Sequence, residues 1–209
     1  MTADDFVVRP EDFLRYMRRT LHVPAAEARL PPDAVLVFGG GDLAAFRRRL
    51  RARPVRWSRW TCAGSSGGRP VAVARAPIGA PATALTVEEA AILGVRRLVS
   101  FGACGSLRED RRIGDGVIPT FAVPDEGTSR HYGRPARPRP DASLRRALAA
   151  ACGARSVPYS EGGVWTMDAP YRESRSRARN LAKRGGVAVD MEASAIYALA
   201  CVRRLRAAS

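Results

Sequence analysis

The sequence predicts an α/β fold, drawn as a three-layer α/β/α arrangement around a mixed central sheet. Three observations support this prediction: short apolar runs alternate with amphipathic or Ala-rich segments, two of the runs end in glycine loops, and one pair surrounds a glycine-rich turn. The 209 residues suffice for one sizeable core. We therefore expect a single domain over residues 1–209, in which residues 1–32 form an N-terminal helix and a linker.

The elements follow from local patterns. Apolar runs bounded by Gly, Pro or charged residues predict strands at residues 34–38, 55–62, 70–76, 97–101, 117–123, 157–165 (one or two strands) and 187–189. Helices are expected at residues 10–21, from the glycine run to residue 50, at 82–93 and 142–152, after residues 168–173, and after residue 192. The first helix has the clearest start, because Pro10 takes its first position and Glu11 and Asp12 its first turn.

Composition limits the classes of partner. The net charge is +15, but Lys183 is the only lysine and the arginines are scattered; the local clusters at residues 47–49, 134–139 and 172–179 are not interleaved with stacking aromatic residues. We therefore expect no nucleic-acid binding. The sequence has no run of about 18 apolar residues and no signal-peptide pattern at its start, which favours a cytoplasmic protein without membrane contact. The four cysteines form no CxxC pair, so reduced thiols are expected and no metal site.

Asp190 and Glu192 flank Met191 where a short apolar run meets an Ala-rich helix. In an open α/β sheet, ligands bind at the carboxyl ends of the strands, so the two carboxylates could serve a site. Acidic residues also favour the positive end of a helix dipole, and this simpler explanation accounts for the pattern equally well.

Two glycine loops follow predicted strands, at residues 39–42 (GGGD) and 102–105 (GACG). A strand, a glycine loop and a helix start can cradle an anion, because free backbone N–H groups point outward. The triple glycine could equally be a plain tight turn.

Five motifs, at residues 78–81, 101–105, 125–132, 166–173 and 189–194, stand in the order found in nucleoside phosphorylases. Over residues 33–202 the chain resembles the branch of uridine phosphorylases and hexameric purine nucleoside phosphorylases. The resemblance implies a pentosyltransferase that cleaves the N-glycosidic bond of a purine or pyrimidine nucleoside with phosphate, giving base and sugar 1-phosphate. It also implies phosphate as co-substrate without a cofactor, and a homo-oligomer, either a dimer or a trimer of dimers.

The resemblance also implies roles for individual residues. Glu192 matches the glutamate that binds the ribose 2′ and 3′ hydroxyls, and Asp190 stands where the family usually has Glu; these two are the catalytic candidates. The remaining candidates would contact the sugar (Met191 and, across a subunit interface, His22) or the base (Trp165, Thr166 and Val189).

The expected phosphate site departs from the family pattern. Ser100 and Ala103 stand where the family has an Arg and a Ser or Thr, and the first loop lacks its usual Arg. Losing arginines removes charge-assisted bidentate contacts. Phosphate would then bind through Gly41, Arg47, Ser100, Gly102 and Ala103.

Two alternatives remain open. Water could replace phosphate in a nucleosidase, with Asp190 or Glu192 as general base. The chain could also be a catalytically impaired homologue that binds nucleosides. In the family a strand, a Ser-Asp pair and a final helix follow the helix after residue 192, and we expect this sequence to lack them. Base specificity is not determined by the sequence.

Overall fold

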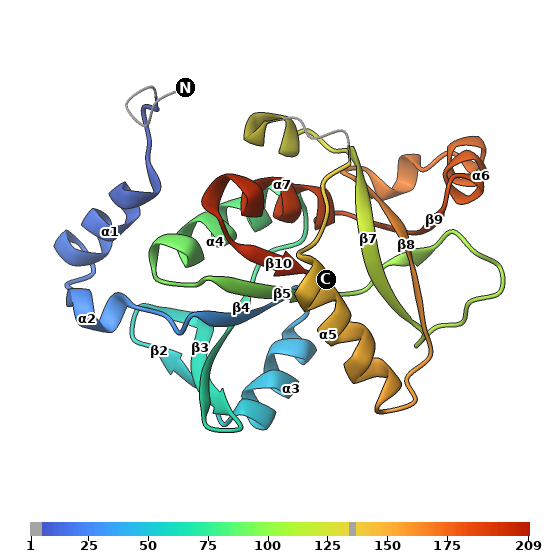
Figure 1. The fold of residues 1–209 in the computed structure, drawn as a ribbon. Helices are drawn as coiled ribbons and strands as arrows, with labels where there is room; N and C mark the ends of the chain where they lie inside the picture. Colours follow the sequence, from blue (N-terminus) through green and yellow to red (C-terminus); the bar gives the residue numbers. More distant parts are fainter. Residues whose placement is uncertain (1–5, 134–136) are drawn as a thin grey trace.

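The computed structural model describes residues 6–133 and 137–209, which form two β-sheets flanked by helices (Figure 1). The strands are β1 (Asp33–Val37), β2 (Arg53–Val55), β3 (Ser58–Ser66), β4 (Arg69–Arg75), β5 (Arg97–Phe101), β6 (Gly105–Ser106), β7 (Gly116–Asp125), β8 (Tyr159–Met167), β9 (Gly186–Asp190) and β10 (Arg206–Ala208). The helices are α1 (Pro10–Arg19), α2 (Ala25–Ala28), α3 (Gly40–Leu50), α4 (Ala80–Ile92), α5 (Ala142–Gly153), α6 (Arg175–Lys183) and α7 (Ala193–Arg203), with 3₁₀ turns η2 (Ser129–Tyr132) and η3 (Pro170–Arg172).

The larger sheet has six strands in the order β10-β5-β1-β4-β3-β2. Strands β10, β5, β1 and β4 are parallel, whereas β3 is antiparallel to both of its neighbours. Gly67 and Gly68, which connect β3 to β4, both have positive φ, at 56° and 76°. A two-residue hairpin turn that matches the twist of the strands needs this conformation, and glycine adopts it without a steric penalty.

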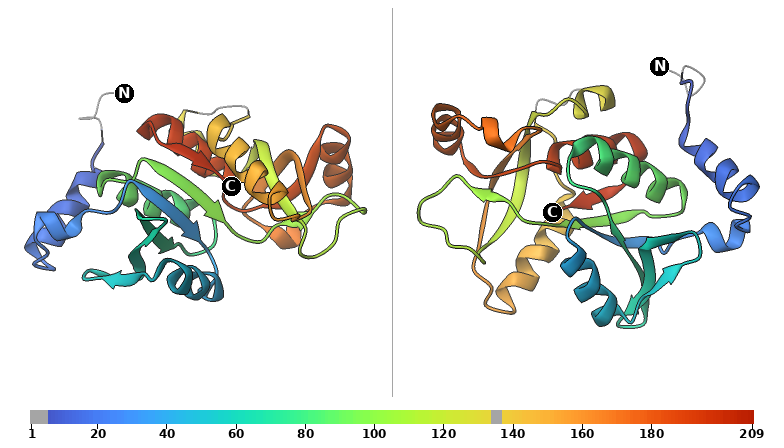
Figure 2. Two further views of the ribbon diagram at one scale, coloured as in Figure 1. Left: turned by 60° about the horizontal axis from the view of Figure 1, so that its bottom comes forward. Right: turned by 180° about the vertical axis from the view of Figure 1, so that it is seen from behind.

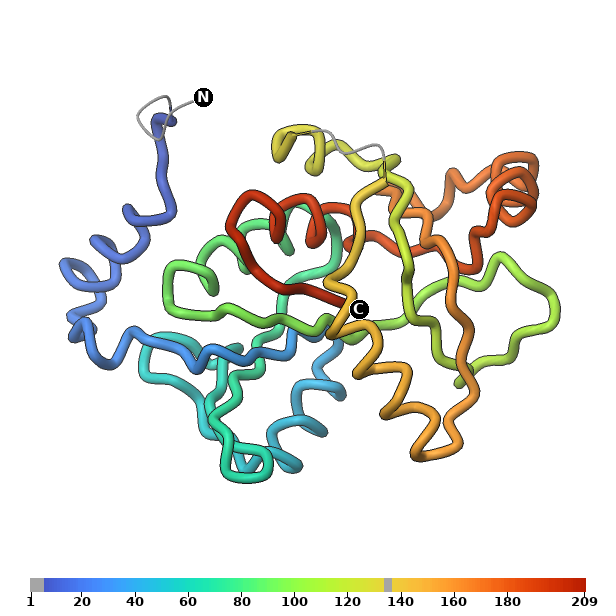
Figure 3. The backbone as a smooth tube through the Cα atoms, in the orientation of Figure 1, coloured from blue at the N-terminus to red at the C-terminus, as the bar shows by residue number. Residues whose placement is uncertain are grey.

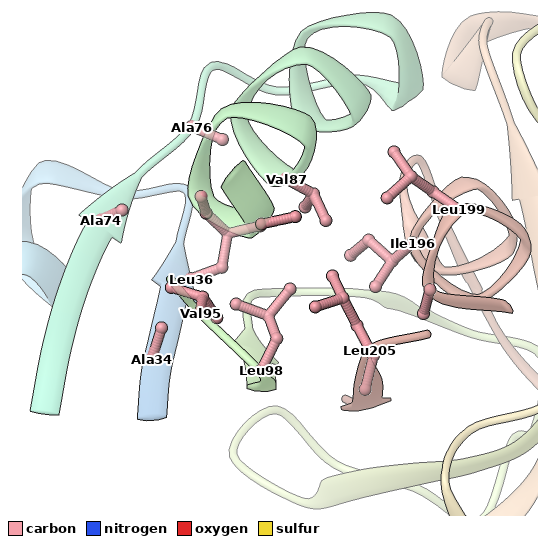
Figure 4. Close-up of a cluster of buried hydrophobic side chains, with 14 of the residues drawn as sticks. Ala34, Leu36, Ala74, Ala76, Val87, Val95, Leu98, Ile196, Leu199 and Leu205 are labelled. Carbon is pink, nitrogen blue, oxygen red and sulfur yellow. The ribbon is translucent and has the colours of Figure 1, made fainter. Parts of the chain in front are cut away.

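Each face of the six-stranded sheet is covered by helices. Side chains that alternate along β1 and β4 point to one face, where they pack against α4 and α7. In this cluster Figure 4 shows side chains of β1, α4, β5, α7 and the turn after α7 converging on one another, among them Leu36, Val87, Leu98, Ile196, Leu199 and Leu205. The other face carries a smaller cluster, in which Val37 and Val73 pack beneath Leu43 and Leu50 of α3.

The smaller sheet has four strands in the order β6-β9-β8-β7. Strand β8 is parallel to both β7 and β9, and the short β6 is antiparallel to β9. Both parallel strands β8 and β9 are followed by helical segments, η3 and then α6 after β8, and α7 after β9. Helix α7 contacts β7 and β8 as well as α4, so it joins the two sheets (Figures 1 and 2).

The predicted mixed α/β class is confirmed, but the strands divide between two sheets and do not form one central sheet. The segment expected as a strand at 55–62 contains a break, because β2 ends at Val55 and β3 begins at Ser58. The expectation that the chain lacks a strand after α7 was wrong, since β10 pairs with β5. Part of the Pro-rich segment 133–140, residues 134–136, lies outside the described residues.

The two ends of the described chain lie in different surroundings (Figure 3). Helices α1 and α2 lie at the periphery, with α1 beside α4, whereas β10 lies within the molecule, between β5 and helix α5. No helix in residues 6–133 and 137–209 is long and apolar enough to cross a membrane.

Candidate functional site

Glu192 lies between β9 and the first residue of α7, and its carboxylate faces the start of α4. Its Oε1 accepts a hydrogen bond of 2.7 Å from the backbone N–H of Gly79, and the residue is only 8% exposed. Burial raises the pKa of Glu192, while hydrogen bonds from the N–H groups of Gly79 and Met191 lower it in part. Gly79 has φ of 106°, which glycine tolerates, so the turn before α4 is shaped to present this N–H.

Asp190, the last residue of β9, is held by two hydrogen bonds. Its Oδ1 accepts from the Thr166 hydroxyl at 2.6 Å, and its Oδ2 accepts from the Ala193 backbone N–H at 2.8 Å. The Thr166 oxygen in turn accepts from the Ser194 N–H at 3.1 Å. Burial is the main cause that raises the pKa of Asp190 to about 6, and the nearby Glu192 charge adds to it. The hydrogen bond from the Ala193 N–H shows that Asp190 caps the start of α7.

The second glycine loop, residues 102–105, is packed between the first loop and β9. A Cβ on Gly102 would lie 2.7 Å from the ring of Phe38, and a Cβ on Gly105 would lie 2.8 Å from Cγ1 of Val189. Real Cβ atoms do not approach other atoms so closely, so a side chain at either position would require its neighbour to move. The two glycines thus bring the ends of β1, β5 and β9 together.

These segments enclose a cleft of about 550 Å³, which is in the range of small-molecule sites. Its walls come from the first loop, the turn before α4, the second loop, the segment after β8, and the β9–α7 junction. The lining residues are Phe38, Gly39, Asp42, Ile78, Gly102, Ala103, Cys104, Gly105, Pro170, Glu173, Val189, Asp190, Met191 and Glu192.

Two further carboxylates fix the loops behind the cleft. Glu126 accepts hydrogen bonds from the N–H groups of Thr128 and Ser129 and from the Ser194 hydroxyl, so it ties the loop after β7 to α7. Burial raises the pKa of Glu126, but these hydrogen bonds outweigh burial and hold the pKa below its usual value. Asp168 accepts a hydrogen bond of 2.9 Å from the Gly127 N–H and links the same loop to the end of β8.

Six of the residues predicted from the sequence line this cleft: Gly102, Ala103, Val189, Asp190, Met191 and Glu192. Of the other phosphate candidates, Gly41 is exposed in the first turn of α3 and Ser100 is buried, with its hydroxyl 2.6 Å from that of Ser209. Arg47 lies in the last turn of α3, where its charge acts on Cys62 of β3. It stands seven positions after Gly40, about 10 Å further along the helix axis.

The predicted sugar and base residues that do not line the cleft have other partners or positions. Trp165 is 2% exposed, and its indole N–H donates to Asp125 at 2.9 Å. Thr166 is fully buried and belongs to the Asp190 network described above. His22 is exposed beyond the end of α1, with a positive φ of 50°.

Sequence reasoning missed several residues of the cleft wall, among them Asp42, Ile78, Cys104, Pro170 and Glu173. It also missed Arg75 at the end of β4, whose Nε donates to the carbonyl oxygen of Phe38 at 3.2 Å. Several of these residues could have been found from their positions in the sequence motifs. Cys104 belongs to the second glycine loop, and Pro170 and Glu173 belong to the motif at residues 166–173.

Comparison with known proteins fits this arrangement. The profile of the phosphorylase superfamily matches residues 33–209, which is most of the chain. The chain belongs to the phosphorylase superfamily. The match begins at β1 and covers each segment that lines the cleft.

Several curated members of the phosphorylase superfamily are similar to this chain. A guanosine phosphorylase of Halorubrum lacusprofundi is 33% identical over 144 residues, which are 68% of this chain and 60% of that protein. A uridine phosphorylase of Thermococcus kodakarensis is 31% identical over 213 residues, or 95% of this chain and 72% of that one. A DeoD-type purine nucleoside phosphorylase of Brevibacillus brevis is 31% identical over 70% of this chain and 63% of its own length.

The fold recurs in a solved member of the superfamily. The crystal structure of uridine phosphorylase from Vibrio fischeri ES114 superposes with a TM-score of 0.81 over 88% of this chain and 79% of that one. Only 22% of the residues are identical, so this comparison shows the shared fold.

Proposed function

We propose that the protein is a nucleoside phosphorylase, which uses phosphate to cleave the N-glycosidic bond of a nucleoside and forms free base and sugar 1-phosphate. The observation that carries the proposal is the Glu192 carboxylate, fixed by the Gly79 N–H at the wall of a cleft that both glycine loops also line. The curated relatives support the reaction class, since their names describe guanosine, uridine and purine nucleoside phosphorylases.

The carboxylate and the apolar side chain at the β9–α7 junction can bind the sugar of a nucleoside. Cleavage of a glycosidic bond develops positive charge on the sugar ring in the transition state. Glu192 supplies a carboxylate that accepts hydrogen bonds from the sugar hydroxyls, and Met191 supplies an apolar surface beside it. Because the carboxylate is already held in place, little reorganisation accompanies the reaction. Asp190 acts through Glu192 and α7, whose position it fixes.

Phosphate would bind between the two glycine loops, in backbone contacts that need no side chain. The first turn of α3 offers unpaired N–H groups at the positive end of the helix dipole. Arg75 touches this loop through the Phe38 carbonyl, and its guanidinium has no ion pair with a described residue. Phosphate is thus proposed as co-substrate, and a second copy of the chain in a homo-oligomer would add contacts from its own arginines.

The proposal is tested with the purified chain and a panel of purine and pyrimidine nucleosides, with and without phosphate. We expect release of base to require phosphate and to yield one sugar 1-phosphate per base. Glu192→Ala should reduce kcat/KM at least 100-fold without a change in the far-UV circular dichroism spectrum. The control Glu11→Ala alters an exposed residue of α1 and should keep full activity. Release that proceeds equally without phosphate, or an active Glu192→Ala variant, would contradict the proposal.

A further inference from the structure

Arg75, the last residue of β4, lies beside the end of β1. It pairs with Val37 in the parallel β1–β4 ladder, and its Nε donates a hydrogen bond of 3.2 Å to the carbonyl oxygen of Phe38, the residue that follows β1. Its guanidinium forms no ion pair within residues 6–133 and 137–209. A half-buried cation therefore serves one backbone carbonyl, at a residue that lines the cleft.

The indole ring of Trp60 holds the Arg75 side chain in this position. The guanidinium carbon of Arg75 lies 4.8 Å from the centre of the ring, which is within the range of a cation–π contact. Thr61 pairs with Ala74 in the antiparallel β3–β4 ladder, so Trp60 and Arg75 stand opposite each other at the next position. Arg59 lies 4.7 Å from the same ring. The ring thus restricts the rotamers of Arg75, a side chain with many conformations when it is free.

The peptide that joins Phe38 to Gly39 transmits the effect of Arg75 to the cleft. The described residues contain no cis peptide bond, so this peptide is trans and its C=O and N–H groups point in opposite directions. With the carbonyl oxygen bound to Arg75, the Gly39 N–H points away from Arg75. No described residue accepts a hydrogen bond from this N–H, and Gly39 lines the cleft.

A hydrogen bond from a charged donor also changes the strength of the N–H on the other side of the peptide. Hydrogen bonds in a chain polarise one another, so the Gly39 N–H becomes a stronger donor when Arg75 binds the Phe38 carbonyl. The same hydrogen bond fixes Phe38, whose ring closely approaches Gly102, since a Cβ added there would lie 2.7 Å from it. Arg75 therefore acts on both glycine loops.

We propose that Arg75 is a positioning residue for phosphate. Held by Trp60, it fixes the Phe38–Gly39 peptide so that the Gly39 N–H faces the anion, and it does not touch the anion itself. This inference rests on the proposed function, in which phosphate binds between the two glycine loops. A donor that is already oriented loses little freedom when the anion binds, and this strengthens binding.

The kinetic test compares Arg75→Met with the native chain at varied phosphate concentration. Methionine can still contact the Trp60 ring but has no donor for the Phe38 carbonyl. We expect KM for phosphate to rise about 10-fold, while KM for the nucleoside and kcat at saturating phosphate change less than about 2-fold. Arg69→Met removes the same charge from the exposed start of β4 and should keep the native constants. A fall in kcat with an unchanged KM for phosphate would mean a purely structural role and would overturn the inference.

The part played by the ring is tested with Trp60→Leu. This variant should raise KM for phosphate by about 2- to 5-fold, because the cation–π contact is lost while the hydrogen bond remains. Added to Arg75→Met, it should cause no further rise, since the ring acts through Arg75. Effects that multiply in the double variant would show that Trp60 does not act by holding Arg75.

Nuclear magnetic resonance separates positioning from direct contact and requires no turnover. Inorganic phosphate added to the isotope-labelled native chain should shift the Gly39 amide resonance and leave the Arg75 Nε–H resonance almost unchanged. Arg75→Met should need roughly 10-fold more phosphate for the same shift. A large shift of the Nε–H resonance would show direct contact with phosphate and overturn the positioning role.

The titration also separates this inference from the reaction itself. If the native chain cleaves nucleosides with phosphate but the Gly39 resonance of both chains responds equally, phosphorolysis stands and the role of Arg75 is wrong. If the native chain cleaves nothing, a Gly39 shift that is weaker in Arg75→Met still supports the inference. The absence of any phosphate-dependent shift at Gly39 overturns it.

Discussion

Asp190 illustrates how burial and hydrogen bonding oppose each other at one side chain. Burial favours the protonated form, while the Thr166 hydroxyl and the Ala193 N–H favour the charged form, and the balance raises the pKa to about 6. The sequence left two explanations for this residue, a ligand-binding carboxylate and a helix-capping one. The structure shows it in both places, capping α7 and lining the cleft.

The raised pKa of Asp190 predicts a pH-dependent stability. The folded chain binds this proton more tightly than the unfolded chain, whose Asp pKa is 3.8, so the stabilisation is fully present below about pH 4 and is lost as the pH rises to about 6. The loss amounts to about 3 kcal/mol, and Asp190→Asn should lack it.

The measurement is the free energy of unfolding in urea between pH 4 and pH 8, for the native chain and the variant. Asp190→Asn should become more stable relative to the native chain as the pH rises through 6. The exposed Glu109→Gln variant serves as control. If the difference in the free energy of unfolding between Asp190→Asn and the native chain stays constant from pH 4 to pH 8, the pKa of Asp190 is not raised in the folded chain.

Of the predicted site residues, those of the second glycine loop and of the β9–α7 junction line the cleft, and the others do not. The trio at 190–192 was found because carboxylates beside a strand end are unusual. Trp165 was predicted at the base; its side chain is buried and packs with Met167 and Val189, and Val189 also lines the cleft.

At the scale of one element, the turn before α4 controls the position of Glu192. Gly79 has φ of 106°, and an alanine there would be strained. Gly79→Ala should therefore lower the free energy of unfolding by about 1–3 kcal/mol and reduce activity, because the N–H that holds Glu192 shifts.

Gly153→Ala is the matched control for this substitution. Gly153 ends α5, an added Cβ meets no atom within 4 Å, and its φ is not positive. Alanine there should keep activity and leave stability unchanged or raise it by up to about 1 kcal/mol. Urea denaturation and nucleoside cleavage measure both variants, and equal behaviour of the two would contradict the role given to Gly79.

Element types were predictable where a pattern was long enough. Helix α4 and strands β1 and β5 fall close to their predicted positions, since each has a sustained apolar pattern. Strand β6 has only two residues, Gly105 and Ser106, and neither favours a strand, so its pairing with β9 comes from tertiary packing. Arg47 was expected near phosphate, but its position late in α3 places it away from the loop.

At the scale of the molecule, α7 contacts strands of both sheets and joins them. Residues 193–200 of this helix are buried, so its packing should contribute strongly to the stability of the whole chain. Leu199 is fully buried in the cluster between α4, α7 and the six-stranded sheet (Figure 4). Leu199→Ala should lower the free energy of unfolding by about 2–5 kcal/mol, because it removes buried surface and leaves a cavity. Leu85→Ala, which changes a leucine of α4 that is 61% exposed, should stay within about 0.5 kcal/mol of the native value.

Chemical denaturation at one protein concentration measures both variants. If Leu199→Ala and Leu85→Ala lower the free energy of unfolding equally, the buried side chains of α7 do not stabilise the core more than exposed ones do. A loss at Leu85 alone would instead indicate that this side chain is covered by another copy.

The division into two sheets was not predictable from the sequence. Strands β5 and β7 are separated only by the second glycine loop, the two-residue β6 and a short connection, yet they belong to different sheets. An apolar strand pattern reports burial and not the identity of the neighbouring strand. The order of elements predicted a mixed three-layer α/β arrangement, and the resemblance to a family added the expectation of a nucleoside phosphorylase-like fold.

The hydrogen bond between Gly79 and Glu192 spans 113 positions of the chain, and this has a consequence for synthesis. A ribosome adds about 5–20 residues per second, so α4 emerges roughly 6 to 20 s before the segment that covers it. During that interval the inner face of α4, with Val87 and Ala91, has no α7 to pack against. The nascent chain therefore exposes part of its apolar core until α7 has been synthesised, and transiently exposed apolar surface of this kind favours aggregation.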